Sequence, residues 1–273
     1  MWRAFTRDRA AVGGLILTVL IVASAIGAPV LAPADPLEHH LGQRLERPSR
    51  AYFLGSDGYG RDVLSRILWG GRASLLVGIS SVVLAIMIGV PMGVLAGYAR
   101  GRTDAWLMRV VDVFMSFPTL IMGLVFVTVL GPGERNLIMA IALVLSPQFA
   151  RLARGSTLAI CGWEFVEAAR AIGANDVRIM ARHILPNILG ELMVIASLLV
   201  ATAIRIEANL SFIGMGGSAE APTWGNMARE GIQFLGTAPW LTVYPGLAIL
   251  FAVLAFNLMG DGLRDVMDPR LHA

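Results

Sequence analysis

Apolar stretches alternate with short polar segments along most of the chain. About 20 apolar residues in a helix cross the roughly 30 Å hydrocarbon core of a membrane. Six stretches suit such spans: Ala10–Ala32, Ala73–Ala99, Val113–Leu130, Asn136–Ala150, Ile188–Gly214 and Leu241–Gly260. The pattern therefore predicts an all-α, polytopic membrane protein with six transmembrane helices. The sequence shows no convincing internal repeat, whereas many secondary transporters are built from such repeats.

Three of these spans have features that bear on the prediction. The first competes with a signal peptide, but Pro29 and Pro33 stand where a cleavage site would be, so we favour an uncleaved span. The third contains Pro118, which predicts a kink. The fourth has only 15 residues and contains Pro147. It can cross a membrane only if the helix continues and Arg151 extends toward the headgroups.

The polar segments between the spans have patterns of their own. Asp35–Arg72 is a long loop, and its second half predicts a short helix lying on the membrane surface, with three apolar residues on one side, Val63, Ile67 and Leu68. Tyr98–Arg109 has the composition of a short basic turn. Trp224–Leu235 predicts a short helix in the polar loop before the last span.

Composition agrees with a membrane location. Hydrophobic residues make up 56% of the 273 residues and charged residues only 15%, whereas soluble proteins carry roughly 25% charged residues. The single cysteine, Cys161, excludes an intrachain disulfide. The net charge of +3 does not indicate nucleic-acid binding, because the arginines stand beside apolar runs.

Arginine placement sets the expected orientation, since cytoplasmic loops carry an excess of basic residues. Thirteen arginines fall on the side of the two termini and eight on the other side, most of them in one long loop. We therefore expect both termini to be cytoplasmic. The chain divides into residues 1–72, the first helix with its extracytoplasmic loop, a core transmembrane domain at 73–265, and a cytoplasmic tail at 266–273.

The segment Glu164–Asn187 is the most polar part of the predicted cytoplasmic side. Two short helices are expected, separated by Gly173 at the end of the first and by Asn175 or Asp176 as the cap of the second. Each has an apolar stripe at helical spacing: Phe165, Ala168, Ala169 and Ile172 in the first, and Val177, Met180, Ala181 and Ile184 in the second.

Charged residues line the edges of the same segment, and Pro186 is expected to end its second helix. Glu164, Glu167 and Arg170 lie on one side of the first helix, and Arg178 and Arg182 form a basic edge on the second. Two interpretations stay open from these residues alone. The segment is either a docking site for a second protein or a loop that folds back on its own bundle.

The wording of this segment resembles the EAA signature of ABC importer permeases, through EAARAIG at 167–173 and HILPN at 183–187. His183 stands where the general pattern has Ile, but HILPN is similar to the peptide/nickel subfamily. Four further stretches are similar to that subfamily: LGSDGYGRDVLSR at 54–66, VDVFMSFP at 111–118, EANLSFIGMG at 207–216 and FNLMGDGLRDVMDPRL at 256–271. The likeness covers the chain from about residue 50 and is strongest to the dipeptide/oligopeptide C-type subunit.

The resemblance implies a type I ABC importer permease in the bacterial cytoplasmic (inner) membrane. Its implied partners are a second homologous permease, two ATPase subunits or one fused ATPase, an extracytoplasmic binding protein and membrane lipid. ATP and Mg would be bound by the ATPases, and this chain, which lacks a GxxxxGK[ST] phosphate loop, would be neither an enzyme nor a cofactor carrier. The implied ATPase-coupling residues are Glu164, Glu167, Ala168, Ala169, Arg170, Gly173, Asp176, Arg178, Arg182 and Pro186.

The resemblance implies import of dipeptides or oligopeptides, and leaves nickel, a metal chelate, glutathione or an opine as alternatives. A secondary transporter would not need the coupling segment. An intramembrane enzyme would need a nucleophile–base or metal constellation, which the sequence does not offer. The adjacent His39 and His40 have no further Cys or His nearby, so we expect no metal site.

Two polar sets outside that segment are candidates for contact with substrate or binding protein. Arg205, Glu207 and Asn209 in the fifth span either line the translocation path, where Arg205 could meet a peptide carboxylate, or lie at the outer interface. Arg205 stands where the family wording has an apolar residue. Asp57, Arg61 and Asp62 either hold the outer loop together or contact the binding protein.

Overall fold

The computed structural model describes residues 8–217 and 221–267. Regular structure in this part is helical, apart from one isolated bridge between Ser56 and Asp62. The helices are α2 (Arg9–Ile26), α3 (Ala28–Leu31), η1 (Leu41–Gln43), α4 (Val63–Ala99), α5 (Gly101–Met115), α6 (Thr119–Leu130), α7 (Glu134–Ile160), α8 (Glu164–Ala171), α9 (Asp176–Ile179), the π turn η2 (Met180–Ile184), α10 (Leu185–Ile213), α11 (Trp224–Ile232) and α12 (Trp240–Met267). The all-α prediction is confirmed.

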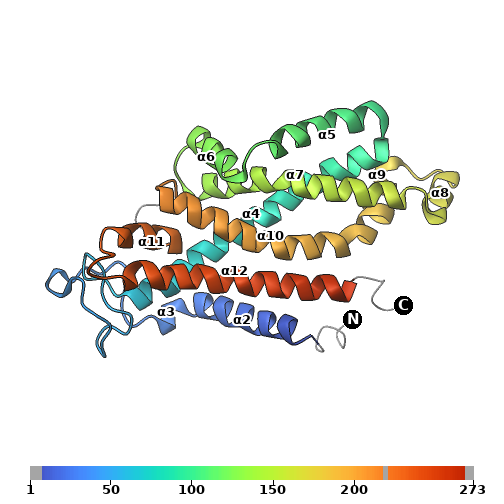
Figure 1. Cartoon of the computed structure of the whole chain (residues 1–273). Coiled ribbons are helices and arrows are strands. Elements are labelled where there is room, and N and C mark those ends of the chain that lie inside the picture. The colour runs from blue at the N-terminus through green and yellow to red at the C-terminus, as the bar shows by residue number, and fades with distance from the viewer. Residues whose placement is uncertain (1–7, 218–220, 268–273) are drawn as a thin grey trace.

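Within the described residues, five helical runs are long and apolar enough to cross a membrane, and the pair α5 and α6 makes a sixth if it counts as one bent span. The long helices run side by side in an elongated bundle (Figure 1). α8 lies at one end of this bundle, where α2 also begins and α12 ends, and α11 lies at the other end. We call these the α8 end and the α11 end.

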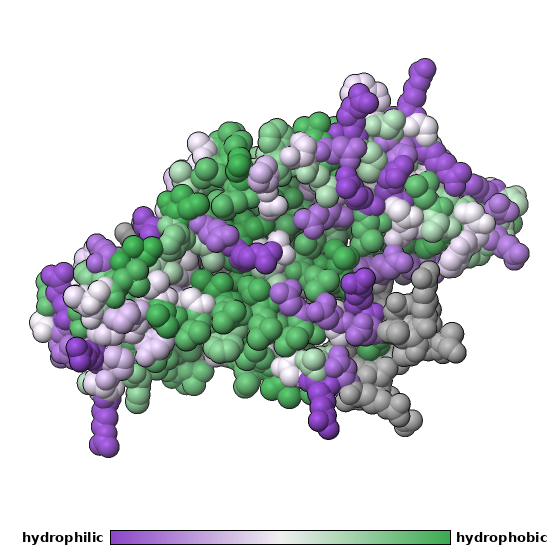
Figure 2. All heavy atoms as spheres, in the orientation of Figure 1, coloured by the Kyte–Doolittle hydropathy of each residue, from purple (hydrophilic) through white to green (hydrophobic). Residues whose placement is uncertain are grey.

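The surface of the bundle follows the same division. Hydrophobic side chains cover most of its middle, and hydrophilic side chains gather toward the two ends (Figure 2). Such a band has the character of a lipid-facing surface, because charged side chains are costly in hydrocarbon. The fold therefore offers two polar ends that are separated by an apolar middle.

α4 is one continuous helix of 37 residues, so the expected separate surface helix after residue 62 is wrong. Asp62 begins it, accepting a hydrogen bond from the backbone N–H of Ser65 at 2.7 Å. Gly71 does not interrupt it because Trp224 packs there, and a Cβ on Gly71 would lie 2.9 Å from Trp224 Cζ2. Residue 72, where the sequence divided an N-terminal unit from the core, lies inside α4. The tail expected from residue 266 lies, apart from the end of α12, outside the described residues.

The expected basic turn at 98–109 is also wrong, because most of it belongs to α5. The expected third span falls on the end of α5 and on α6, two helices that meet at 98° across a short break that ends at Pro118. Proline cannot donate to the preceding turn, so a break, sharper than the expected kink, occurs at this residue.

The weak fourth span is the middle of α7, a helix of 27 residues that continues through Pro147. Two of its charged residues, Arg151 and Arg154, pair with aspartates of α5. Arg151 Nη2 lies 2.6 Å from Asp112 Oδ1, and Arg154 Nη2 lies 2.6 Å from Asp104 Oδ2. These pairs hold α5 against α7.

The closest helix packing joins α4 to α7. Gly89, Gly93 and Gly97 recur at four-residue spacing and form one face of α4, which allows two backbones to approach closely. A Cβ on Gly93 would lie 2.2 Å from the backbone oxygen of Ala150, and one on Gly89 would lie 2.2 Å from that of Ser146. The space between these helices therefore admits no side chain at the glycine positions.

Gly93→Ala is therefore expected to push α4 away from α7 and to lower stability by about 1–3 kcal/mol, as overpacking does. The matched control is Gly155→Ala on α7, because a Cβ there meets nothing within 4 Å. Thermal unfolding of the purified protein in detergent measures both. Equal unfolding midpoints for the two variants would contradict the close packing.

Candidate coupling segment and outer cavity

The segment Glu164–Asn187 is built as a helix, a glycine turn and a second helix. α8 packs Val166 and Ala169 into the core of the bundle. Gly173 follows with φ of +82°, a left-handed conformation that glycine adopts without the cost of a Cβ. The N–H of Gly173 donates to Arg170 O at 3.0 Å and that of Ala174 to Ala169 O at 3.1 Å. The predicted stop at Gly173 is confirmed.

The second helix starts at the predicted cap and is tied to the end of α4. Asn175 Oδ1 accepts a hydrogen bond from the N–H of Arg178 at 2.8 Å. The hydroxyl of Tyr98 donates to Asp176 Oδ1 at 2.6 Å, and the guanidinium of Arg170 lies 5.0 Å from the centre of the Tyr98 ring. Tyr98, which the sequence did not single out, therefore joins both helices of the segment to α4.

The segment has an inner apolar face and an outer one, so the predicted stripes are only partly right. Val166, Ala169, Ile179 and Ile184 are buried in the bundle. Ile172 and Val177 are 85% and 70% exposed, as are, to lesser degrees, Phe165 and Ala168. Six charged residues are exposed as well: Glu164, Glu167, Arg170, Asp176, Arg178 and Arg182. Exposed apolar side chains rimmed by charges are typical of a surface that binds another protein.

Pro186 does not end the second helix, and that prediction is wrong. The helical run continues from Asp176 to Ile213, over 38 residues. The π turn at Met180–Ile184 shifts the pairing by one residue, so that the N–H of Leu185 donates to Met180 O. This shift places Pro186 in the first turn of α10, where its missing N–H is tolerated. The segment is thereby joined rigidly to a membrane-crossing helix.

The polar residues of α10 point in two directions, as their spacing predicts. Arg205 and Asn209, one turn apart, are exposed on one side of the helix. Glu207 is fully buried on the other side, where it accepts a hydrogen bond from Ser211 Oγ at 2.7 Å and faces the hydroxyls of Ser74 and Thr223. Glu207 therefore connects α10 to α4 and to the start of α11.

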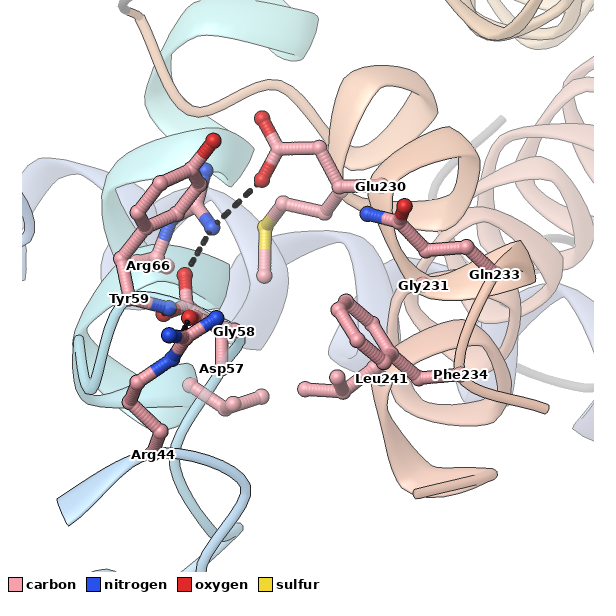
Figure 3. Close-up of a pocket in the computed structure, with 12 residues that line it drawn as sticks. Arg44, Asp57, Gly58, Tyr59, Arg66, Glu230, Gly231, Gln233, Phe234 and Leu241 are labelled. Atoms are coloured by element: carbon pink, nitrogen blue, oxygen red, sulfur yellow. Dashed lines mark hydrogen bonds and ion pairs between the residues drawn. The ribbon is translucent and has the colours of Figure 1, made fainter. Parts of the chain in front are cut away.

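A cavity of about 230 Å³ opens at the α11 end, between the loop before α4 and the helices α11 and α12. Arg44, Tyr59 and Arg66 lie on one side of it, and Gln233 and Phe234 lie on the other (Figure 3). The apolar part of its lining consists of Val63, Met227, Phe234 and Leu241.

A buried ion cluster closes one wall of this cavity. Arg61 Nε lies 2.6 Å from Asp57 Oδ2, and one oxygen of Glu230 lies 2.9 Å from both Arg61 Nη2 and Arg66 Nη1. Arg66 also pairs with Asp57. Asp57, Arg61 and Arg66 are each less than 10% exposed. The cluster fixes the loop to α11. Its members Arg66 and Glu230 were missed in the sequence analysis: Glu230 is far from Asp57 in the chain, and no pattern marked Arg66 as a partner of Asp57.

The charge state of Asp57 follows from these partners. Burial alone would raise the pKa of this carboxyl group, but Arg66, Arg61 and two backbone N–H groups hold the pKa below its usual value. The ionised carboxylate therefore stabilises the folded loop at any pH above the unfolded pKa. That contribution is lost only as the pH falls through the lower folded pKa.

Comparison with known proteins decides which family has this architecture. The family described as the binding-protein-dependent transport system inner membrane component matches residues 89–273. The chain belongs to this family. Residues 1–48 match the N-terminal transmembrane domain of oligopeptide transport permease C, so the chain is a C-type permease of an ABC importer.

Full-length relatives support the assignment of this permease. It is 43% identical over 273 residues to a glutathione transport system permease protein from Pectobacterium atrosepticum, with 100% of this chain and 91% of the relative covered. It is 40% identical to a di/tripeptide transport system permease protein from Pseudomonas aeruginosa, over 99% of this chain and 91% of the relative. A dipeptide transport system permease protein from Alkalihalophilus pseudofirmus is 38% identical, over 100% of this chain and 90% of the relative.

Solved structures show the same fold at lower identity. A chain of the inward-facing MetNI methionine ABC transporter matches with a TM-score of 0.62 and 22% identity, covering 75% of this permease and 98% of that chain. A second crystal form of that transporter matches with a TM-score of 0.60 and 21% identity, covering 74% of this permease and 97% of that chain. The permease bundle is therefore the fold of an ABC importer subunit, and the segment Glu164–Asn187 lies within the part that defines the family.

Asp57→Asn is expected to loosen the loop before α4, because removing one partner of a buried ion cluster costs about 3–5 kcal/mol. Hydrogen–deuterium exchange over residues 44–62 should become at least tenfold faster. Glu38→Gln, which changes an exposed carboxylate in the same loop, serves as the control. Unchanged exchange in Asp57→Asn would show that the cluster does not hold the loop.

Proposed function

We propose that this permease is driven by ATPase subunits that bind the outer face of the segment Glu164–Asn187. The observation that carries the proposal is the pair Ile172 and Val177, exposed at the tip of a segment continuous with α10. An apolar pair of this kind suits a groove on a second protein, where buried apolar residues contribute most of the binding energy. The predicted coupling residues Glu164, Glu167 and Arg178 would lie at the rim of that contact.

The connections of the segment explain how movement would pass into the membrane. The run from Asp176 to Ile213 would act as one lever, because neither the π turn nor Pro186 interrupts it. Tyr98 would carry the same movement to α4 through Asp176 and Arg170. A displacement of the segment therefore changes the positions of two membrane-crossing helices together.

The α8 end is cytoplasmic in this proposal, with both termini on that side, and the α11 end faces an extracytoplasmic binding protein. The arginine distribution supports this orientation. Asp57, Arg61 and Asp62 would shape the receiving surface from within, since all three are buried, and exposed residues such as Phe53 and Tyr59 would make the contact. A second permease subunit would complete the path.

Short peptides are the substrate class that we infer, because the relatives named above are peptide and glutathione permeases. Glutathione is itself a small peptide with free carboxylates, so the two names describe one kind of solute. ATP and Mg would be bound by the partner ATPases, and this chain would contribute the path and its coupling.

Ile172→Asp is expected to weaken association with the ATPase at least tenfold, about 1.4 kcal/mol, and to abolish ATP-driven uptake into proteoliposomes. Ile172 is 85% exposed, so the variant should still fold. Phe53→Asp, an exposed apolar residue at the opposite end, should retain the ATPase during purification. Normal ATPase binding and uptake by Ile172→Asp would sink the proposal.

Gly173 gives a second test that separates conformation from bulk. A Cβ at this position meets nothing within 4 Å, so any effect of a side chain arises from the φ of +82°, which costs an ordinary residue about 1–2 kcal/mol. Gly173→Val should lower the ratio of uptake to ATP hydrolysis, and Gly173→Asn, which tolerates this region better, should largely preserve it. Equal ratios for the two variants would contradict the role of the turn.

A further inference from the structure

We propose that Arg205 recognises a carboxylate of the passing solute and that Asn209 completes this contact one turn further along α10. The inference rests on the proposed function, since it takes α10 to line the translocation path. It goes further by naming the chemical group that the path selects.

Along the long axis of the bundle, Arg205 lies toward the middle and not at the polar rim. Its neighbour Ile204 packs against Gly78, near the middle of α4, where a Cβ would lie 2.8 Å from Ile204 Cγ1. Its other neighbour, Ile206, lies beside Gly123 of α6. Arg205 also precedes the end of α10 at Ile213 by about 12 Å of helix. These contacts place the guanidinium level with the apolar middle of the subunit.

The guanidinium is exposed at this depth, and no residue that the structure describes neutralises it. Its hydrogen bond to Thr202 Oγ1 is long, at 3.5 Å, and no acidic residue of the described chain forms an ion pair with it. Glu207 points into the bundle instead. Arg151 and Arg154, in contrast, both have aspartate partners.

The surface around this charge is apolar. Hydrophobic side chains cover most of the middle of the bundle (Figure 2). A charged side chain within a membrane-crossing helix is costly in lipid, by about 2.5–3.5 kcal/mol at the least, and such residues face a partner or a water-filled cavity. The face with Arg205 and Asn209 therefore points to an aqueous path and not to lipid.

The chemistry of the pair selects for carboxylates. Arginine stays charged at every accessible pH and presents a planar fork that binds a carboxylate with two parallel hydrogen bonds. The Asn209 amide adds a donor and an acceptor, which suits a peptide group beside that carboxylate. The same positive charge repels free metal cations, so the site favours peptides over nickel as the solute.

Cysteine labelling of the assembled importer tests this site without knowledge of the natural solute. Asn209→Cys is placed in a Cys161→Ser background, and its rates of reaction with a negatively charged and a positively charged methanethiosulfonate are compared. The ratio of the rate with the negative reagent to the rate with the positive reagent should be highest while the positive charge at Arg205 is present. Arg205→Gln should lower the ratio of the two rates by about tenfold, and Arg205→Lys should preserve it.

Phe53→Cys, at an exposed position of the polar loop before α4, is the matched control, and its rates should not respond to changes at Arg205. Two results would overturn the proposal. In the first, the thiol of Asn209→Cys reacts with neither reagent, which is expected if this face is buried because Arg205 pairs with an acid of the second permease. In the second, the ratio of the two rates is independent of Arg205. ATP-driven uptake by the cysteine-free importer is measured alongside. Uptake without labelling rejects the site alone, whereas absent uptake rejects the proposed function.

Discussion

The contact between the backbones of α4 and α7 is the constraint on which the rest of the permease depends. Gly89, Gly93 and Gly97 leave no room for a side chain between the two helices. Van der Waals contact of this kind, rather than hydrophobic burial, holds helices together in lipid. Because α4 is held along this face, its two ends are fixed as well, and each end carries a polar site.

The two ends of α4 show how the bundle links distant surfaces. At one end Arg66 belongs to the buried ion cluster that shapes the outer cavity. At the other end Tyr98 holds the segment Glu164–Asn187 through Asp176. α10 makes a second connection, because it begins in that segment and passes Arg205 before it reaches α11. Movement at the coupling segment would therefore reach both the path and the outer cavity.

Much of this organisation could be predicted from local sequence. Five of the six expected spans, the turn at Gly173 and the cap at Asn175 depend on residues close together in the chain, and these were found. The opposite directions of Arg205 and Glu207 also follow from helical spacing. Which of the two is buried could not be predicted, because that depends on Ser74 and Thr223 in other elements.

The failures share a physical cause. Pro186 and Pro147 are helix breakers by local rules, but a π turn accommodates the first and α7 continues through the second. Asp57 and Arg61 were named as residues that could hold the loop together, but their partner Glu230 was missed because it is distant in sequence from Arg61 and Arg66. Pairing and packing partners of this kind are set by the fold, and a single sequence does not contain them.

Cross-linking from the tip of the coupling segment tests the central claim most directly. Ile172→Cys in the Cys161→Ser background, assembled with the partner subunits, is treated with a short thiol–amine cross-linker. The account predicts a product that joins this chain to an ATPase subunit, and none from Phe53→Cys in the same background. An intact complex that yields no such product from position 172, or yields it equally from position 53, would contradict the account.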